Sequence, residues 1–243
     1  ERHESLGGVC LNVGCIPSKS LLHTAEVINE TKHASELGVT FSKPKIDLEG
    51  VKKNKDSIVS KLTGGIQALA KARKVNVLNG YAKFISKNQV AVEGLDEVIE
   101  FEQCIIAVGS RVTKFPMFPF EDSRVMDSTD ALLLDDIPKR LLVVGGGIIG
   151  LEMATIYDAL GSEITIVELG GQIIPAADKD IVSPLFKIAK KNYANVFLNT
   201  KVTSMNALKK GIKVEFEGKD APKNDTFDKV LVAVGRTPNG NLI

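Results

Sequence analysis

Residues 145–150 follow the pattern Gly-x-Gly-x-x-Gly, and they lie between an apolar segment at 141–144 and a segment of helical periodicity at 149–160. A second apolar segment, 163–167, leads directly into Glu168. A glycine-rich turn between a strand and a helix, followed by a second strand with an acidic residue at its end, is typical of a dinucleotide-binding unit. The sequence therefore predicts an α/β fold in which parallel strands alternate with crossover helices.

Each glycine of that pattern, and the acidic residue after it, has its own physical role. Gly145 allows the tight turn, Gly147 lets the backbone approach a pyrophosphate, and Gly150 permits close packing of helix on strand. Glu168 follows Gly145 by 23 positions, where its carboxylate can accept hydrogen bonds from both ribose hydroxyls. A 2′-phosphate would be repelled by this carboxylate, so the sequence favours NAD over NADP. The alternative is a glycine turn that binds no nucleotide.

The composition sets limits on the other classes of protein. The chain has 243 residues, of which 44% are hydrophobic and 25% charged, as in ordinary globular proteins. A formal net charge of +1 argues against a surface for nucleic acid or anionic membranes. The longest apolar stretch, 141–151, is too short to span a bilayer. The polar N-terminus does not resemble a secretory signal.

Hydrophobic periodicity predicts a coarse order of elements. Amphipathic helices are expected at 16–37 and 47–73, followed by a meander of short strands at 75–78, 81–85, 90–92 and 98–101. Residues 104–108 are continuously apolar, which predicts a buried strand containing a buried Cys104. The second half predicts strands at 141–144, 163–167, 196–198, 202–207, 212–216 and 230–234, with helices at 149–160 and 178–191. Segments 105–111 and 232–238 resemble each other, which hints at two nucleotide-binding halves.

Cys10 and Cys15 form a closely spaced pair near the N-terminus. In a regular helix their α-carbons would lie about 7.5 Å apart or more, whereas a disulfide requires about 4.4 to 6.8 Å. The pair can be bridged only if the chain is distorted, and Gly14 provides that freedom. A helix starting at Cys15 would stabilise its thiolate, and Lys19 would lie on the same helical face. A metal site is disfavoured, because no further cysteine pair or spaced histidine completes four ligands.

Residues 7–19, with the sequence GGVCLNVGCIPSK, resemble the redox-disulfide signature of the pyridine nucleotide-disulfide oxidoreductases. Further matches lie at 128–132, 175–178 and 235–239, so the resemblance covers the whole chain. It implies two Rossmann-like domains of the FAD/NAD(P)-binding fold, the FAD domain being incomplete. Within the family, the sequence of this motif is most similar to that of the members that oxidise dihydrolipoyl groups. Members that reduce glutathione usually have a lysine in place of Ser18.

The resemblance implies an enzyme that oxidises protein-bound dihydrolipoamide and passes the electrons through FAD to NAD. By this resemblance Cys10 is the thiol that exchanges with the dihydrolipoyl group, and Cys15 faces the flavin in a charge-transfer contact. Lys19 lies beside the isoalloxazine and pairs with Glu152. The implied partners are the dihydrolipoyl acyltransferase of a 2-oxo acid dehydrogenase complex and a second copy of the full-length protein. Neither nucleic acid nor membrane is expected as a partner.

The cofactor contacts are implied in the same way. Glu1 matches the acidic residue that holds the adenosine ribose of FAD, and Val108 stands where the family often has threonine. The implied FAD contacts are Glu1, Gly7, Gly8, Lys19, Ala82, Val108, Gly109 and Ser110. The implied NAD contacts are Gly145, Gly146, Gly147, Ile148, Ile149, Gly150, Glu152, Glu168, Val202, Ala233, Val234, Gly235 and Arg236. No metal ion is expected.

The resemblance also predicts domain limits. Residues 1–112 are expected to form a partial FAD-binding domain with the redox disulfide, 113–236 an NAD-binding domain, and 237–243 the return to the first domain. The family has an earlier glycine-rich FAD motif and a later dimerisation domain with a catalytic histidine, a role that none of His3, His23 and His33 fits. We therefore expect an internal fragment, inactive alone, of a protein from the bacterial cytoplasm or, second, the mitochondrial matrix.

Three alternatives remain open from the sequence. The first is another flavin-dependent disulfide reductase. The second is a soluble pyridine nucleotide transhydrogenase, against which the pair of Cys10 and Cys15 speaks. The third is an inactive nucleotide-binding fragment with a vestigial cysteine pair.

Overall fold

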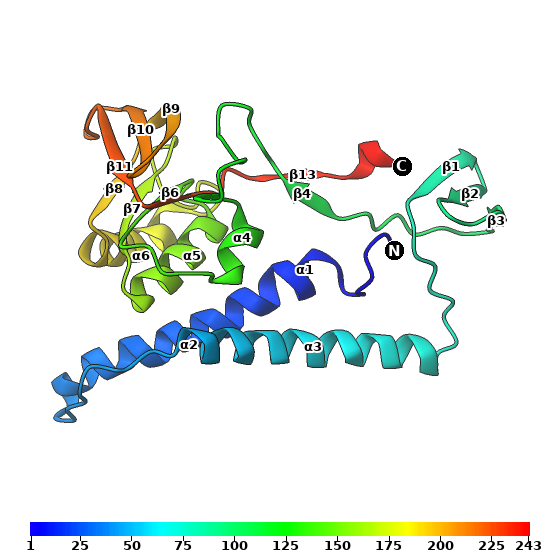
Figure 1. Ribbon diagram of the computed structural model, residues 1–243, viewed down its shortest axis with the longest axis horizontal. Helices are drawn as coiled ribbons and strands as arrows, with labels where there is room; N and C mark the ends of the chain where they lie inside the picture. The colour runs from blue at the N-terminus through cyan, green and yellow to red at the C-terminus, as the bar shows by residue number, and fades with distance from the viewer.

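A computed structural model describes residues 1–243. An α/β body holds most of the second half of the chain, two long helices run side by side beneath it, and a small meander lies at the opposite end (Figure 1). A two-stranded ribbon of β4 (Ser110–Val112) and β13 (Arg236–Pro238) runs between the body and the meander. Both chain ends lie near this ribbon, and a short 3-10 turn, Gly240–Leu242, ends the chain.

The body is built on a five-stranded parallel sheet with the order β5-β12-β6-β7-β8. Crossover helices follow β6 and β7, so the predicted alternation of parallel strands and helices is confirmed. The chain moves outward from β6 to β8 and then returns to the other side of β6, which makes a switch point between β6 and β12. The bounds are β5 (Val125–Met126), β6 (Arg140–Val144), α5 (Ile148–Leu160), β7 (Glu163–Val167), α6 (Lys179–Asn192), β8 (Asn195–Phe197) and β12 (Lys229–Val232).

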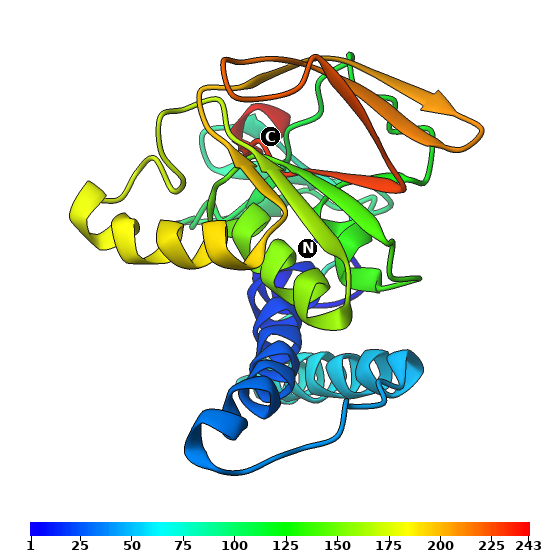
Figure 2. The same ribbon diagram turned by 90° about the vertical axis from the view of Figure 1, so that its left-hand side faces the viewer.

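Both faces of this sheet are buried. Successive side chains of a strand point to opposite faces. Accordingly, Leu141 and Val143 of β6 pack in a cluster with α5 and the short helix α4 (Ser128–Leu133), whereas Leu142 and Val144 pack in a second cluster. That second cluster is closed by an antiparallel sheet, which caps the body (Figure 2). Its strands are β9 (Lys201–Leu208), β10 (Gly211–Glu217) and β11 (Asn224–Phe227).

The first 72 residues are mostly helical. They comprise α1 (Gly8–Val13), α2 (Cys15–His33), a 3-10 turn (Ala34–Leu37) and α3 (Leu48–Ala72). On α2, the apolar side predicted from periodicity is buried: Leu21 joins the first core cluster, and Ala25 and Ile28 pack against Ala159 of α5. The helix that begins at Cys15 is therefore docked on the helix that follows the glycine turn. No helix combines the length and the apolar character that crossing a bilayer requires.

The meander is shorter than predicted. It consists of β1 (Ala82–Ser86), β2 (Gln89–Val92) and β3 (Ile99–Glu100), paired antiparallel. The predicted strand at 75–78 is wrong, since these residues form no strand. The terminal amino group of Glu1 instead donates to Leu78 O at 3.0 Å, and Gly80 N donates to Glu1 O at 3.0 Å. The chain start thus lies beside the entry to the meander.

The predicted buried strand at 104–108 is also wrong. These residues form no strand, Ile105 is 92% exposed, and Cys104 is exposed rather than buried. An apolar segment becomes a strand only when a neighbouring strand pairs with its backbone, and no strand of the chain lies beside this one. Pairing begins two residues later at Ser110, where β4 meets β13. The two segments that resemble each other in sequence thus meet at their polar ends.

One ion pair at the start of β5 predicts a pH dependence of stability. Arg124 donates to both carboxylate oxygens of Asp122, at 2.9 and 2.7 Å, and these hydrogen bonds lower the pKa of Asp122 to about 2. Because the folded pKa lies below the ordinary value of 3.8, this stabilisation is present above pH 4 and disappears as the pH falls toward 2. We expect Asp122→Asn to lower the Tm by about 1–2 °C at pH 7. The difference should vanish near pH 2 in thermal melts, and a constant difference across this range would contradict the assignment.

Candidate functional site

The glycine turn connects β6 to α5 at a very close approach. Gly145 has a left-handed φ of 108°, and a Cβ there would lie 2.4 Å from Ala233 O. A Cβ on Gly150 would lie 2.1 Å from Gly145 O. Both positions are therefore restricted to glycine by the protein itself, because side chains would collide with backbone. The close packing of helix on strand predicted for Gly150 is present.

Gly147 is different, because nothing in the protein requires a glycine there. Its φ of −75° and ψ of −179° suit any residue, and nothing lies within 4 Å of the position of a Cβ. Gly147 caps α5, whose first N–H groups have no side-chain partner. An open backbone and free N–H groups at a helix start fit the pyrophosphate of a dinucleotide. The fold does not require a glycine at 147, whereas the close approach of a ligand to the backbone would.

A cavity of about 320 Å³ opens beside this turn. We call it the glycine-turn cavity. It brings together six of the predicted NAD contacts: Gly147, Ile148, Ile149, Ala233, Gly235 and Arg236. The loop after β7 adds Ile174, Pro175 and Ala176, and α4 adds Ser128. Sequence reasoning did not assign these four residues to the site, although two matched segments contain three of them. The cavity lies at the switch point of the sheet, where ligands of such folds bind.

Glu168 holds the glycine turn from the end of β7. Its Oε2 accepts a hydrogen bond from Gly146 N at 2.7 Å, and its Oε1 accepts one from Gly170 N at 2.7 Å. The residue is 9% exposed. Each carboxylate oxygen can accept a further hydrogen bond, so the group remains able to accept from ribose hydroxyls. Val202 is buried in the second core cluster, which leaves only its backbone for a ligand, while Val234 is exposed.

The two cysteines lie on either side of a break in the helix. Gly14, with φ −144° and ψ −115°, separates α1 from α2, and Cys15 is the first residue of α2. Both thiols are free and exposed. A hydrogen bond with Cys15 is the main cause of the raised pKa of Cys10, so the two thiols interact across the break. No group of three or more His, Cys, Asp or Glu side chains could hold a metal ion.

An ion pair joins the thiol helix to the dinucleotide helix. Lys19 Nζ of α2 lies 2.6 Å from Glu152 Oε1 of α5. This hydrogen bond is the main cause of the raised pKa of Lys19, which keeps the side chain positively charged. Lys19 lies one turn after Cys15, and Glu152 lies in the second turn after Gly147. The ion pair thus links the helix that carries Cys15 to the helix that follows the glycine turn.

The residues expected to contact FAD are spread over three segments. Gly8 and Gly109 have left-handed φ values of 60° and 67° with nothing within 4 Å of a Cβ, so the backbone is open there. Glu1 and Ala82 are exposed, on the chain start and on β1. A backbone hydrogen bond from His3 to Glu1 Oε1, at 3.0 Å, lowers the pKa of this carboxyl. The Asn239 side chain donates to Val108 O at 2.9 Å, and Gly7 has a left-handed φ of 107°.

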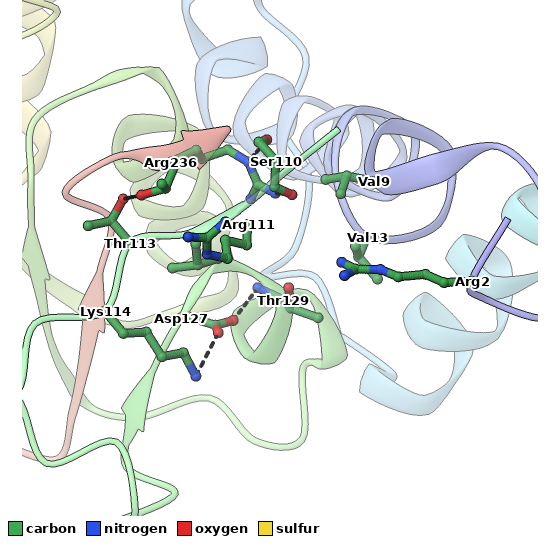
Figure 3. A pocket seen from close by; sticks show the side chains of 12 residues that line it. Arg2, Val9, Val13, Ser110, Arg111, Thr113, Lys114, Asp127, Thr129 and Arg236 are labelled. Carbon is green, nitrogen blue, oxygen red and sulfur yellow. Dashed lines mark hydrogen bonds and ion pairs between the residues drawn. The ribbon is translucent and has the colours of Figure 1, made fainter. Parts of the chain in front are cut away.

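A second, larger cavity of about 570 Å³ lies between α1 and β4 (Figure 3). We call it the basic cavity. Four basic residues line it, Arg2, Arg111, Lys114 and Arg236, against one acidic residue, Asp127. Arg236 Nε donates to Ser110 Oγ at 2.8 Å, so an expected NAD contact and an expected FAD contact touch each other. The positive lining fits a ligand that carries phosphate groups. Arg2, Arg111 and Lys114 are scattered along the sequence, and no local pattern groups them.

Fold and site together define a class: a dinucleotide-binding fold with a pair of interacting thiols at the start of a helix that is ion-paired to the helix after the glycine turn. The family model described as pyridine nucleotide-disulphide oxidoreductase matches residues 3–243. The chain belongs to this family. It is 52% identical over 246 aligned residues to the dihydrolipoyl dehydrogenase of Vibrio cholerae, covering 100% of this chain and 52% of that protein. It is also 52% identical to the dihydrolipoyl dehydrogenase of Haemophilus influenzae, covering 100% of this chain and 51% of that protein.

A solved structure agrees on the fold. The HOCl-induced flavoprotein disulfide reductase RclA of Escherichia coli, as a Cu(II) complex, superposes with a TM-score of 0.80 at 27% identity. The match covers 99% of this chain and 51% of that one. The chain thus spans about half the length of the curated relatives it matches.

We expect alanine to reduce the stability of the protein at position 145 and its affinity for NADH at position 147. Gly145→Ala should destabilise the protein by about 2 kcal/mol or more, because it adds backbone strain and a collision with Ala233 O. Gly147→Ala should change the free energy of unfolding by less than about 0.5 kcal/mol yet weaken NADH binding about tenfold. Thermal unfolding and NADH titration of both variants check this. Equal destabilisation of both would contradict the assignment of Gly147 to a ligand.

Proposed function

We propose that this chain is part of a flavin-dependent dihydrolipoyl dehydrogenase that oxidises protein-bound dihydrolipoamide and reduces NAD⁺ to NADH. One observation carries the proposal. The helix that begins at Cys15 is ion-paired through Lys19 to Glu152 on the helix that begins at the glycine turn. This ion pair fixes the helix that carries Cys15 on the helix that begins the dinucleotide site, and a protein that passes electrons from a dithiol through a bound flavin to a nicotinamide needs these two elements in a fixed relation. The two relatives with this name, at 52% identity, support the same reading.

The thiol chemistry is a dithiol–disulfide exchange in two displacements. In the oxidised protein a disulfide joins Cys10 to Cys15, and a substrate thiolate attacks Cys10 Sγ. The S–S bond breaks, and its electron pair leaves on Cys15. The second substrate thiol then displaces Cys10, which closes the lipoyl disulfide and leaves both cysteines reduced. FAD, when bound, accepts these two electrons and supplies them to NAD⁺ as a hydride.

The chain's own residues prepare Cys15 for this role. Cys15 is the first residue of α2, so its sulfur lies at the positive end of the helix dipole. The ammonium of Lys19 stands one turn away, and Glu152 holds it in place and protonated. A hydrogen bond with Cys15 is the main cause of the raised pKa of Cys10, so the two sulfur atoms lie close enough to interact.

The cofactor positions follow from the open backbones. We place the pyrophosphate of NAD at Gly147 and its ribose at Glu168. The remaining NAD contacts line the glycine-turn cavity, together with the Val202 backbone. We place FAD along Glu1, Gly8, Gly109 and Ser110 toward the basic cavity, whose positive lining suits its phosphates. In this proposal residues 1–112 and 237–243 serve the flavin and residues 113–236 serve NAD.

The wider setting is proposed on the same grounds. An acyltransferase of a 2-oxo acid dehydrogenase complex supplies the dihydrolipoyl group. The full-length protein works as a homodimer in the bacterial cytoplasm, with the mitochondrial matrix as the second choice. The two bacterial relatives support this order.

Substitution of Cys15 tests the thiol chemistry. We expect Cys15→Ser in the full-length protein to lower dihydrolipoamide oxidation at least about a thousandfold, since a hydroxyl cannot form the disulfide. NADH affinity should stay unchanged. Cys104→Ser is the matched control, because Cys104 is also exposed and free. Parent-like turnover in Cys15→Ser would refute the role of this thiol.

Substitution of Glu168 tests the choice between NAD and NADP. We expect Glu168→Ala to weaken NADH binding about 10- to 100-fold, since it removes charged hydrogen bonds to the ribose. NADPH binding should improve or stay the same, because the repulsion of its 2′-phosphate is lost. Isothermal titration with both nucleotides measures the ratio of the two affinities. An unchanged ratio would show that Glu168 only holds the glycine turn.

A further inference from the structure

Lys55 is a buried cation that the proposed chemistry does not use. Three charged residues are buried in the whole chain: Lys55, Asp127 and Glu168. Asp127 caps α4, and Glu168 holds the glycine turn. Lys55 lies on α3, is 6% exposed, and forms an ion pair with its neighbour Asp56 at 3.0 Å. Burying an ammonium is costly unless it is well paired, so its position calls for an explanation.

The ammonium of Lys55 bonds to the end of another helix. Lys55 Nζ donates to Leu132 O at 2.8 Å. Leu132 lies in the last turn of α4, where carbonyl groups lack partners within the helix and cations are favoured. The preceding carbonyl, Ala131 O, accepts a hydrogen bond from the buried hydroxyl of Tyr157 at 2.8 Å. The C-terminal end of α4 is thus held by one side chain from α3 and one from α5.

The other end of α4 forms walls of both cavities. Asp127 and Thr129 line the basic cavity, and Figure 3 shows them at the start of this short helix. Ser128, between them, lines the glycine-turn cavity. A helix of six residues is a stiff unit, so a shift at its C-terminal end moves its N-terminal end as well. The bond from Lys55 therefore bears on a helix whose first residues line both cavities.

We propose that Lys55 is a positioning residue that holds α4 in place and thereby sets the shape of the glycine-turn cavity. It acts through Leu132 O and Ser128 and touches no ligand itself. The bond also joins α3, which packs on the thiol helix α2, to the α/β body. The inference rests on the proposed function in one respect, namely that the glycine-turn cavity binds NAD(H).

The test compares two lysines of the same helix in the full-length protein. We expect Lys55→Met to raise the Kd for NADH about tenfold, as a displaced cavity wall weakens contacts made around it. The rates at which a thiol reagent modifies Cys10 and Cys15 should not change, because α1 and α2 keep their packing. Lys53→Met is the control, since Lys53 is exposed on α3. Lys55→Arg should restore the affinity to within about threefold, because a guanidinium can also donate to Leu132 O.

The outcomes of this comparison either support or overturn the positioning role of Lys55. Parent-like NADH affinity in Lys55→Met would overturn the positioning role, and so would altered thiol reactivity together with no rescue by arginine. If Lys55→Met does not fold, Lys55→Arg is measured by itself, and an NADH affinity more than about threefold below the parent's in that folded variant would overturn the role, because its guanidinium can still donate to Leu132 O. A parent protein that binds no NADH would refute the proposed function instead, so the two failures are distinguishable.

Discussion

The site depends on the contact between the start of α5 and the end of β6. A Cβ at Gly150 would lie 2.1 Å from Gly145 O, so this contact exists only because both residues are glycines. The close approach lets α5 begin at the carboxyl end of the sheet, at the switch point between β6 and β12. Its free N–H groups therefore face the glycine-turn cavity, and Glu152 emerges one turn later toward α2. A wider spacing between helix and strand would move both features away from the thiols.

The buried charges of this chain share one physical principle. Glu168 accepts N–H groups of the turn, Asp127 accepts N–H groups at the start of α4, and Lys55 donates to a carbonyl at its end. In each case the charge meets the unpaired backbone groups that every turn or helix end leaves. The desolvation cost is offset in this way, and loops and short helices gain a fixed position. These segments form the cavity walls. The hydrogen bonds that pair their backbone groups therefore also set the shape of the site.

The sequence predicted strands correctly where neighbouring strands pair with them. Residues 141–144 and 104–108 are both continuous apolar runs, yet only the first is a strand, because β7 and β12 lie on either side of it. Helices α2 and α3 were predicted closely because periodicity is a local property. Helix α4 was not predicted as an element, since six residues are too few to show a period. The pairing of β4 with β13 was missed because it joins segments more than a hundred residues apart.

The sequence by itself determined the chemistry that depends on neighbours along the chain. The glycines of the turn, the acidic residue after the second strand and the spacing of Cys10 and Cys15 around Gly14 are all local, since backbone conformation is set over a few residues. The resemblance implied that Lys19 pairs with Glu152, but only the packing of α2 on α5 brings these residues, 133 positions apart, to 2.6 Å. The same holds for Lys55 and Leu132 and for the four basic residues of the basic cavity. Tertiary structure decided these contacts, because the rotation of one helix on another is set by side-chain packing across the core.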